Sequence, residues 1–159
     1  MIRLFDAQWE LKGYDNAIKK MRDLPVKVRA KAGRSALGRA ARIVTNAAKD
    51  NAKRIDDAET GRTIAANVVQ RFRSRFFKQT GDLMISVGVA TNKGPIPKGN
   101  PDEGPKGNTP HWHLIERGTE KAKAQPFMLP ALVQNIDAVE AKFAVELEKQ
   151  IDKIVKTNT

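Results

Sequence analysis

A long predicted helix over residues 26–55 constrains the fold more than any other part of the sequence. Its apolar residues recur every three, four or seven positions, the spacing that gives a helix one apolar face. That face consists of Val26, Ala30, Gly33, Leu37, Ala41, Val44, Ala48 and Ile55. Because most of these side chains are small, the face suits close approach by another element. Gly33 and Gly38 each cost the helix about 1 kcal/mol relative to alanine, so we expect tertiary packing to offset them.

The opposite side of this predicted helix is strongly basic. Its charged residues are Lys27, Arg29, Lys31, Arg34, Arg39, Arg42, Lys49, Lys53 and Arg54, with Asp50 as the acidic exception. The whole chain has 29 lysines and arginines and 18 aspartates and glutamates, a net charge of +11. An excess of this size implies a polyanion or an acidic protein surface as a partner. The composition alone does not distinguish between the two.

The middle of the chain is expected to form a small antiparallel sheet. Arginines alternate with other residues from 71 to 76, which is typical of a half-buried strand with a basic outer face. Residues 83–90 predict a second, more buried strand, so 71–90 is interpreted as a β-hairpin. Residues 62–70 fit either a helix or a strand. Alternation over 111–116 predicts a third strand.

The chain ends in a second long predicted helix. Its apolar stripe consists of Leu132, Val133, Ile136, Val139, Phe143, Leu147, Ile151 and Ile154. The length fits a single domain over 1–159. Residues 1–12 predict an N-terminal arm or strand, 15–24 a short helix, and 91–110 a flexible loop rich in glycine and proline. The expected fold class is α+β, with a long N-terminal basic helix and a long C-terminal helix packed on a small antiparallel sheet.

The composition argues against several functional classes. The chain has no cysteine, which excludes disulfides, thiol nucleophiles and cysteine zinc sites. No apolar run approaches the roughly 18 residues of a membrane span, and no signal-peptide layout opens the chain, so we expect a protein made in a cytoplasm. There is no Gly-x-Ser-x-Gly nucleophile motif, and the acidic pairs at 56–57 and 102–103 lie in predicted turns. We therefore expect no catalytic residues, no enzymatic activity and no cofactor.

Two histidines form the best metal-binding pattern in the sequence, and the pattern is weak. His111 and His113 are two residues apart on a predicted strand, where both side chains point the same way. A third ligand would have to come from nearby acidic residues such as Glu116. An exposed strand face beside a polar loop explains the same pattern. We therefore predict no metal site and keep the two histidines as the candidates.

The basic residues raise a second functional possibility. Arg34, Arg39 and Arg42 of the long helix, together with Arg71, Arg73 and Arg75, are candidates for an interface or for a surface that faces DNA. Such side chains neutralise phosphates along a nucleic-acid backbone. Non-specific nucleic-acid binding through the basic helix 27–54 is therefore the alternative function. No recognised nucleic-acid-reading module accompanies these residues, and a solvated face is the commonest meaning of such a pattern.

Residues 114–131, LIERGTEKAKAQPFMLPA, resemble a family of small tail components of lambda-like long-tailed phages and prophages, called tail-completion, neck or head–tail joining proteins. The matching positions are Glu116, Gly118, Thr119, Ala124, Pro126, Phe127, Pro130 and Ala131. The segments 9–13 and 24–28, and Thr60 and Gly61 after the long helix, are also similar to the family pattern. The chain departs from the pattern at 56–59, where the usual Ala-Pro is absent, and in the length of the 91–110 loop.

The resemblance implies a structural virion protein rather than a catalyst. It predicts assembly in the host cytoplasm, and a place in the tail or neck of the virion, where the protein finishes the tail and attaches it to the head. It also implies a homo-oligomeric ring, expected to be a hexamer, that contacts head-closure and tail-terminator or tail-tube proteins. A ring of this kind needs two different surfaces on each subunit. The basic helix and the 91–110 loop are the candidates, and the signature residues are expected to maintain the fold first.

Overall fold

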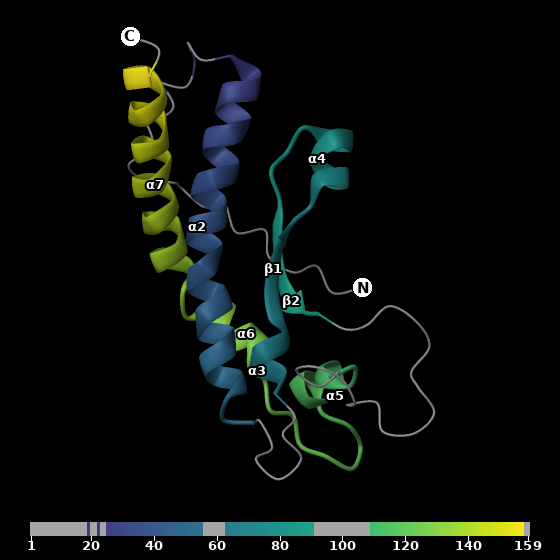
Figure 1. The fold of residues 1–159 in the computed structure, drawn as a ribbon. Coiled ribbons are helices and arrows are strands. Elements are labelled where there is room, and N and C mark those ends of the chain that lie inside the picture. Colours follow the sequence, from purple (N-terminus) through teal and green to yellow (C-terminus); the bar gives the residue numbers. More distant parts are fainter. Residues whose placement is uncertain (1–18, 20–21, 23–24, 56–62, 91–108, 158–159) are drawn as a thin grey trace.

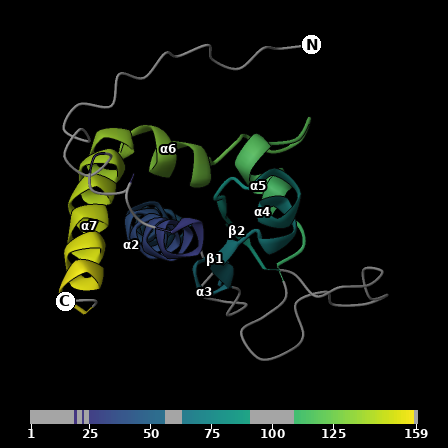
Figure 2. The same ribbon diagram turned by 90° about the horizontal axis from the view of Figure 1, so that it is seen from above.

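The computed structural model describes residues 19, 22, 25–55, 63–90 and 109–157. Its elements are α2 (Val26–Ala52), α3 (Ile64–Asn67), β1 (Val68–Phe72), α4 (Ser74–Thr80), β2 (Ile85–Val89), α5 (Trp112–Arg117), α6 (Met128–Val133) and α7 (Ile136–Thr157). Figure 1 shows α7 running beside α2, with the β1–β2 hairpin on the other side of α2. The view from above places α2 between α7 and the hairpin (Figure 2). The predicted α+β class, with two long helices and a small antiparallel sheet, is confirmed.

Several predictions fall on residues outside the described part of the chain. These are the N-terminal arm at 1–12, nearly all of the 91–110 loop, and the Thr60–Gly61 pair. The short helix predicted over 15–24 is described only at Lys19 and Arg22, which are both helical.

Small residues allow α2 and α7 to pack closely. Ala32 and Ala36 of α2 are buried against Leu147 and Ile151 of α7, and Phe143 and Ile154 pack around this cluster. An alanine at the contact allows two helix axes to come close together, because its side chain is too short to hold them apart. The apolar stripe predicted for the C-terminal helix is therefore the surface that α7 uses to bind α2.

A second apolar cluster lies on the side of α2 that faces the sheet and α6. Its buried members are Val44, Ala48, Ala52, Ile64, Ala65, Val68, Phe127 and Ala131. Since α2 has partners on two sides, its buried surface is wider than the single predicted stripe, and it includes Ala32, Ala36, Ala40 and Ala52. Val26 was predicted to be apolar core and is instead 69% exposed, because the helix begins there beyond both clusters.

One face of the hairpin is fixed to α2 by specific contacts. The strands are antiparallel, with the register running from Val68 opposite Val89 to Phe72 opposite Ile85. The Gln70 amide donates a hydrogen bond to the Gly38 carbonyl (3.0 Å), and its oxygen accepts one from the Thr45 hydroxyl (3.1 Å). Alternate residues of a strand share a face, so Val68, Gln70 and Phe72 all point toward α2.

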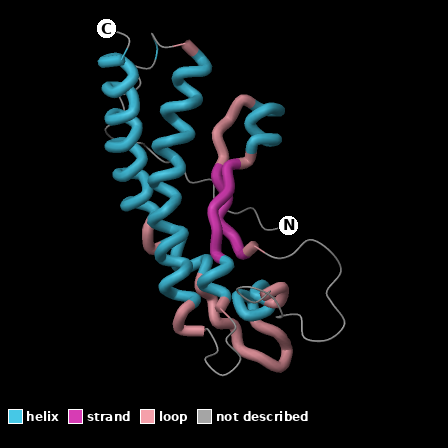
Figure 3. Tube along the Cα trace, viewed as in Figure 1, coloured by secondary structure: helices cyan, strands magenta, loops and turns pink. Residues whose placement is uncertain are grey.

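The secondary structure differs from the sequence prediction in two short segments. The strand predicted over 71–76 ends at Phe72, and Ser74–Thr80 forms helix α4, which Gly81 ends at a φ of 82°. The third strand predicted over 111–116 is wrong, because Trp112–Arg117 forms helix α5. Alternation over six residues is too short to separate a strand from a helix, and tertiary contacts decide the outcome. As Figure 3 shows, strand structure within the described residues is confined to the hairpin.

Two further segments each contain two elements. Residues 62–70, which fit either structure, contain both: helix α3 passes directly into β1. The single final helix is divided into α6 and α7 at Gln134 and Asn135. No helix in the described part of the chain is long and apolar enough to cross a membrane.

Gly38→Ala is expected to stabilise the protein. A Cβ at Gly38 would lie 3.6 Å from Cδ1 of Ile85, an ordinary van der Waals contact. The substitution therefore removes the conformational cost of a glycine inside a helix and should raise the free energy of unfolding by about 0.5–1 kcal/mol. Urea unfolding measures the change.

Gly33→Ala is the matched control on the same helix. A Cβ there would lie 2.7 Å from Cδ1 of Leu83, so that side chain must move. Gly33→Ala should therefore raise the free energy of unfolding by less than Gly38→Ala does. If Gly38→Ala destabilises the protein instead, the helix does not accept a methyl group beside β2, and the contact with Ile85 is tighter than the structure shows.

Candidate functional site

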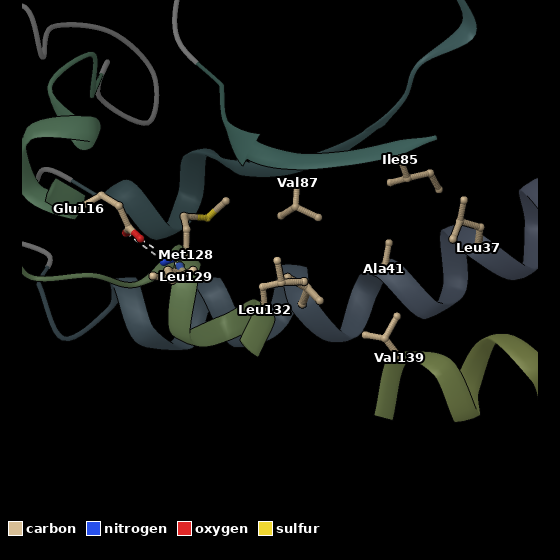
Figure 4. Close-up of a pocket in the computed structure, with 10 residues that line it drawn as sticks. Leu37, Ala41, Ile85, Val87, Glu116, Met128, Leu129, Leu132 and Val139 are labelled. Atoms are coloured by element: carbon tan, nitrogen blue, oxygen red, sulfur yellow. Dashed lines mark hydrogen bonds between the residues drawn. The ribbon is translucent and has the colours of Figure 1, made fainter. Parts of the chain in front are cut away.

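The Glu116 carboxylate caps a helix that lies eleven residues farther along the chain. It accepts hydrogen bonds from the backbone amides of Phe127 (2.8 Å), Met128 (3.0 Å) and Leu129 (2.9 Å), as Figure 4 shows in part. These amides open α6, and the first amides of any helix lack partners within it. No local side chain caps this end of α6. A negative charge at a helix N-terminus also interacts favourably with the helix dipole.

A tight turn after α5 brings the chain back to this carboxylate. Gly118 adopts a φ of 77°, and a Cβ there would lie 2.7 Å from the backbone nitrogen of Ala124, so only glycine fits. The Thr119 hydroxyl accepts a hydrogen bond from the amide of Ala122 (3.0 Å), and the amide of Gln125 donates to the Ile115 carbonyl (2.8 Å). The Glu-x-Gly-Thr motif therefore shapes the loop that returns to Glu116.

Phe127 anchors this loop in the core. Its side chain is 0% exposed, and its ring meets that of Trp112 edge-on at 6.3 Å between centroids. Its carbonyl accepts a hydrogen bond from the Asn51 side chain near the end of α2 (3.2 Å). Pro130 is half-buried within α6, whereas Ala124 and Pro126 are exposed in the returning loop. The signature residues of 116–130 thus lie together as one cap-and-turn unit.

An apolar groove, which none of the sequence patterns predicts, runs beside this unit. It has a volume of about 480 Å³ and is lined by Leu37, Ala41, Val44, Ile85, Val87, Glu116, Met128, Leu129, Leu132 and Val139. Figure 4 shows Ile85 and Val87 of β2 on one side of the groove and Leu132 of α6 on the other. Leu129 and Leu132 remain 60% and 50% exposed. The sequence signal was the apolar segment 127–133 (FMLPALV). It contains more large apolar side chains than a helix of six residues can bury on one face.

The structure separates the arginines of α2 that were proposed as one surface. The Arg34 guanidinium lies 4.1 Å from the centre of the Phe72 ring, on the hairpin side of the helix. Arg39 instead forms an ion pair with Glu146 of α7 (2.6 Å), on the other side. Arg42 is exposed. These three residues therefore do not form a single basic face.

Arg71, Arg73 and Arg75 remain exposed at the end of the hairpin. Arg71 is on the strand face that points away from α2, Arg73 precedes α4, and Arg75 lies within α4. A hollow of about 400 Å³ brings Arg73 and Arg75 together with Phe72, Ser74, Phe76, Gln79 and Met84. The basic residues at this end of the hairpin thus border the half-buried Phe72 and Phe76 and the exposed Met84.

The ion pair between α2 and α7 makes part of the stability depend on pH. The pKa of Glu146 is lowered because the Arg39 guanidinium donates a hydrogen bond to it, and Lys142 adds a second. A lowered folded-state pKa adds stability that is present above the unfolded value of about 4.3 and is lost as the pH falls through the folded value. Relative to Glu146→Gln, the wild type should therefore be more stable at pH 7, with the difference shrinking below about pH 4.3.

Urea unfolding of both proteins from pH 7 to pH 3 tests this expectation. Glu120→Gln, at an exposed position in the loop after α5, is the control and should track the wild type throughout. A gap between the wild type and Glu146→Gln that stays constant with pH would show that the ion pair contributes nothing.

The two histidines do not form the predicted pair. His111 precedes α5 and His113 lies within it, so they are two positions apart on a helix, where side chains do not face each other. Nδ1 of His113 lies 3.1 Å from the Pro110 carbonyl oxygen. Over the ranges that the structure describes, no three histidine or acidic side chains are grouped so that they could hold a metal ion. The strand geometry behind the metal hypothesis is therefore wrong.

Comparison with known proteins adds a family assignment. The model of the HK97-gp10-like family, described as "Bacteriophage HK97-gp10, putative tail-component", matches residues 15–118. No curated protein and no solved structure matches the chain significantly. The matched range is well over half of the chain and includes α2, the hairpin, Glu116 and Gly118. The chain therefore belongs to the HK97-gp10-like family of bacteriophage tail-component proteins.

Proposed function

We propose that this protein is a non-enzymatic subunit that completes the phage tail at the head–tail joint. The family assignment supports a tail component, and the surface of α4 supports an assembly role. No residue of α4 is buried, and the helix projects at the end of the hairpin away from α7 (Figure 1). Its hollow combines Phe72, Phe76 and Met84 with Arg73 and Arg75. Aromatic residues, methionine and arginine are the types enriched in protein interfaces.

The α4 hollow is one of the two different surfaces that a ring subunit requires. We propose a homo-oligomeric ring, a hexamer, that lies between head-closure and tail-terminator or tail-tube proteins in the virion neck. Its subunits fold in the host cytoplasm before they join the tail. The net charge of +11 fits a partner surface rich in acidic residues.

Light scattering across protein concentration, with and without a tail-terminator protein of the same phage or prophage, tests the proposal. We expect a discrete ring or complex for the wild type and its loss in the double variant Arg73→Glu, Arg75→Glu. Lys78→Glu is the matched control, because Lys78 is exposed on the same helix and lies outside the hollow. A strict monomer that ignores the partner would overturn the proposal, as would equal effects of both charge reversals.

Nucleic-acid binding is the second candidate, and the exposed arginines at the end of the hairpin favour it. Arg71, Arg73 and Arg75 form no ion pair with any residue that the structure describes. Fluorescence anisotropy with duplex DNA at increasing salt separates the two functions. A DNA-binding protein should lose affinity steeply with salt, and Arg71→Ala should reduce the slope by about 1. Weak DNA binding by a protein that assembles with the tail terminator would exclude this second candidate.

A further inference from the structure

The apolar groove has the properties of a binding site for an apolar chain segment. Of its ten lining residues, Glu116 is the one with an ionisable side chain, and its carboxylate is already occupied by three backbone amides. The side chains of Leu129 and Leu132 border it at 60% and 50% exposure. Large exposed apolar surface of this kind marks a place where another segment binds.

β2, which borders the groove, has an edge without a partner strand. Ile85 and Val87 of β2 line the groove from the face of the hairpin that points toward α2, while no residue of β1 lines it. Within the described residues β2 pairs with β1 alone, so its other edge is unpaired next to these two residues. Such an edge presents unpaired N–H and C=O groups that template a further strand. An occupant that is both extended and apolar on one face would satisfy the edge and the groove together.

The sequence contains a segment with these properties. In residues 5–12, Phe5, Ala7, Trp9 and Leu11 alternate without exception with Asp6, Gln8, Glu10 and Lys12. A strand with this pattern has one fully apolar face and one fully polar face. We propose that residues 5–12 bind in the groove of their own chain as a third strand beside β2, with Phe5, Ala7, Trp9 and Leu11 facing inward.

Residues 13–25, which connect the proposed strand to α2, are long enough to let residues 5–12 reach the groove. From Val26 at the start of α2, the groove begins at Leu37, about 16 Å along the helix axis, and continues to Val44, about 27 Å away. The thirteen residues 13–25 span about 43 Å when extended and about 20 Å when fully helical. A tether of this length holds the segment at an effective concentration in the millimolar range. Its own groove is therefore filled before that of another copy.

Disulfide trapping tests the proposal directly, because the natural chain has no cysteine. The variant Ala7→Cys, Leu132→Cys should oxidise to a monomer with an internal cross-link, seen by mass and by non-reducing electrophoresis. Ala7→Cys, Val133→Cys is the matched control, because Val133 is on the same helix and similarly exposed (58%) but does not line the groove. We expect at least tenfold slower closure in the control.

Tryptophan fluorescence gives a second readout without cysteines. In a Trp112→Phe background Trp9 is the single tryptophan, and its emission should be blue-shifted and independent of protein concentration. Adding Leu132→Asp should shift it to the red, whereas adding Val133→Asp should not, with circular dichroism verifying the fold. Cross-linked dimers would overturn the proposal, because they would show that residues 5–12 bind the groove of a neighbouring copy. Red emission in all variants, with no preference in cross-linking, would show that residues 5–12 do not bind the groove.

Discussion

Phe127→Ala is expected to lower the free energy of unfolding by about 3–5 kcal/mol. The ring is completely buried, and it joins α2, β1 and α6 in the larger apolar cluster. Removing it leaves a cavity beside Trp112, whose ring packs edge-on against the phenylalanine. The melting temperature should fall by about 6–20 °C, at 2–4 °C per kcal/mol for a chain of this size. Thermal and urea unfolding measure both quantities.

Phe76→Ala provides the matched control for this substitution. Phe76 is half-buried on α4, a helix with no buried residue, so its loss should cost under about 1.5 kcal/mol. Equal losses for the two variants would show that Phe127 is not the centre of the core. Phe127→Leu should recover part of the stability, since it refills most of the cavity.

Glu116→Ala is expected to cost about 2–4 kcal/mol, because three backbone amides lose a charged acceptor at once. The substitution leaves the first turn of α6 without a cap. Amide hydrogen exchange should accelerate at Phe127, Met128 and Leu129 before it does elsewhere in the chain. Urea unfolding gives the overall cost, and exchange locates it.

A substitution at Glu120 separates this cap from a general effect of charge. Glu120 is exposed in the loop that follows α5, so Glu120→Ala should change the unfolding free energy by less than about 0.5 kcal/mol. The loss of unfolding free energy in Glu116→Gln should lie between those of Glu116→Ala and Glu120→Ala, because an amide keeps one acceptor oxygen and loses the charge. If Glu116→Ala proves as mild as Glu120→Ala, water replaces the carboxylate at the helix end and the motif does not stabilise the fold.

The long helices are the part of the fold that local sequence determined. Over 26–52 and 136–157, apolar residues recur at helical spacing for many turns, and this repetition distinguishes a helix from a strand. Membership in a phage tail-component family was also predictable, from motifs spread along the chain.

Short segments were decided by tertiary contacts. Residues 71–76 and 111–116 alternate in the manner of strands, yet helices form at 74–80 and 112–117, because six residues satisfy both periodicities equally well. Which alanines of α2 are buried depended on the presence of two partners, α7 on one side and the sheet with α6 on the other. A single chain pattern does not contain that information.

The sequence by itself determined where the long helices run, and only the tertiary structure decided what the signature residues contact. In the sequence, Glu116 is only a motif position; in the structure, the turn at Gly118 brings the start of α6 to its carboxylate. The groove likewise exists only where α2, β2, α6 and α7 meet. The reason is physical: helical periodicity is a property of neighbours within four residues, whereas caps, ion pairs and grooves depend on distances between segments far apart in the chain.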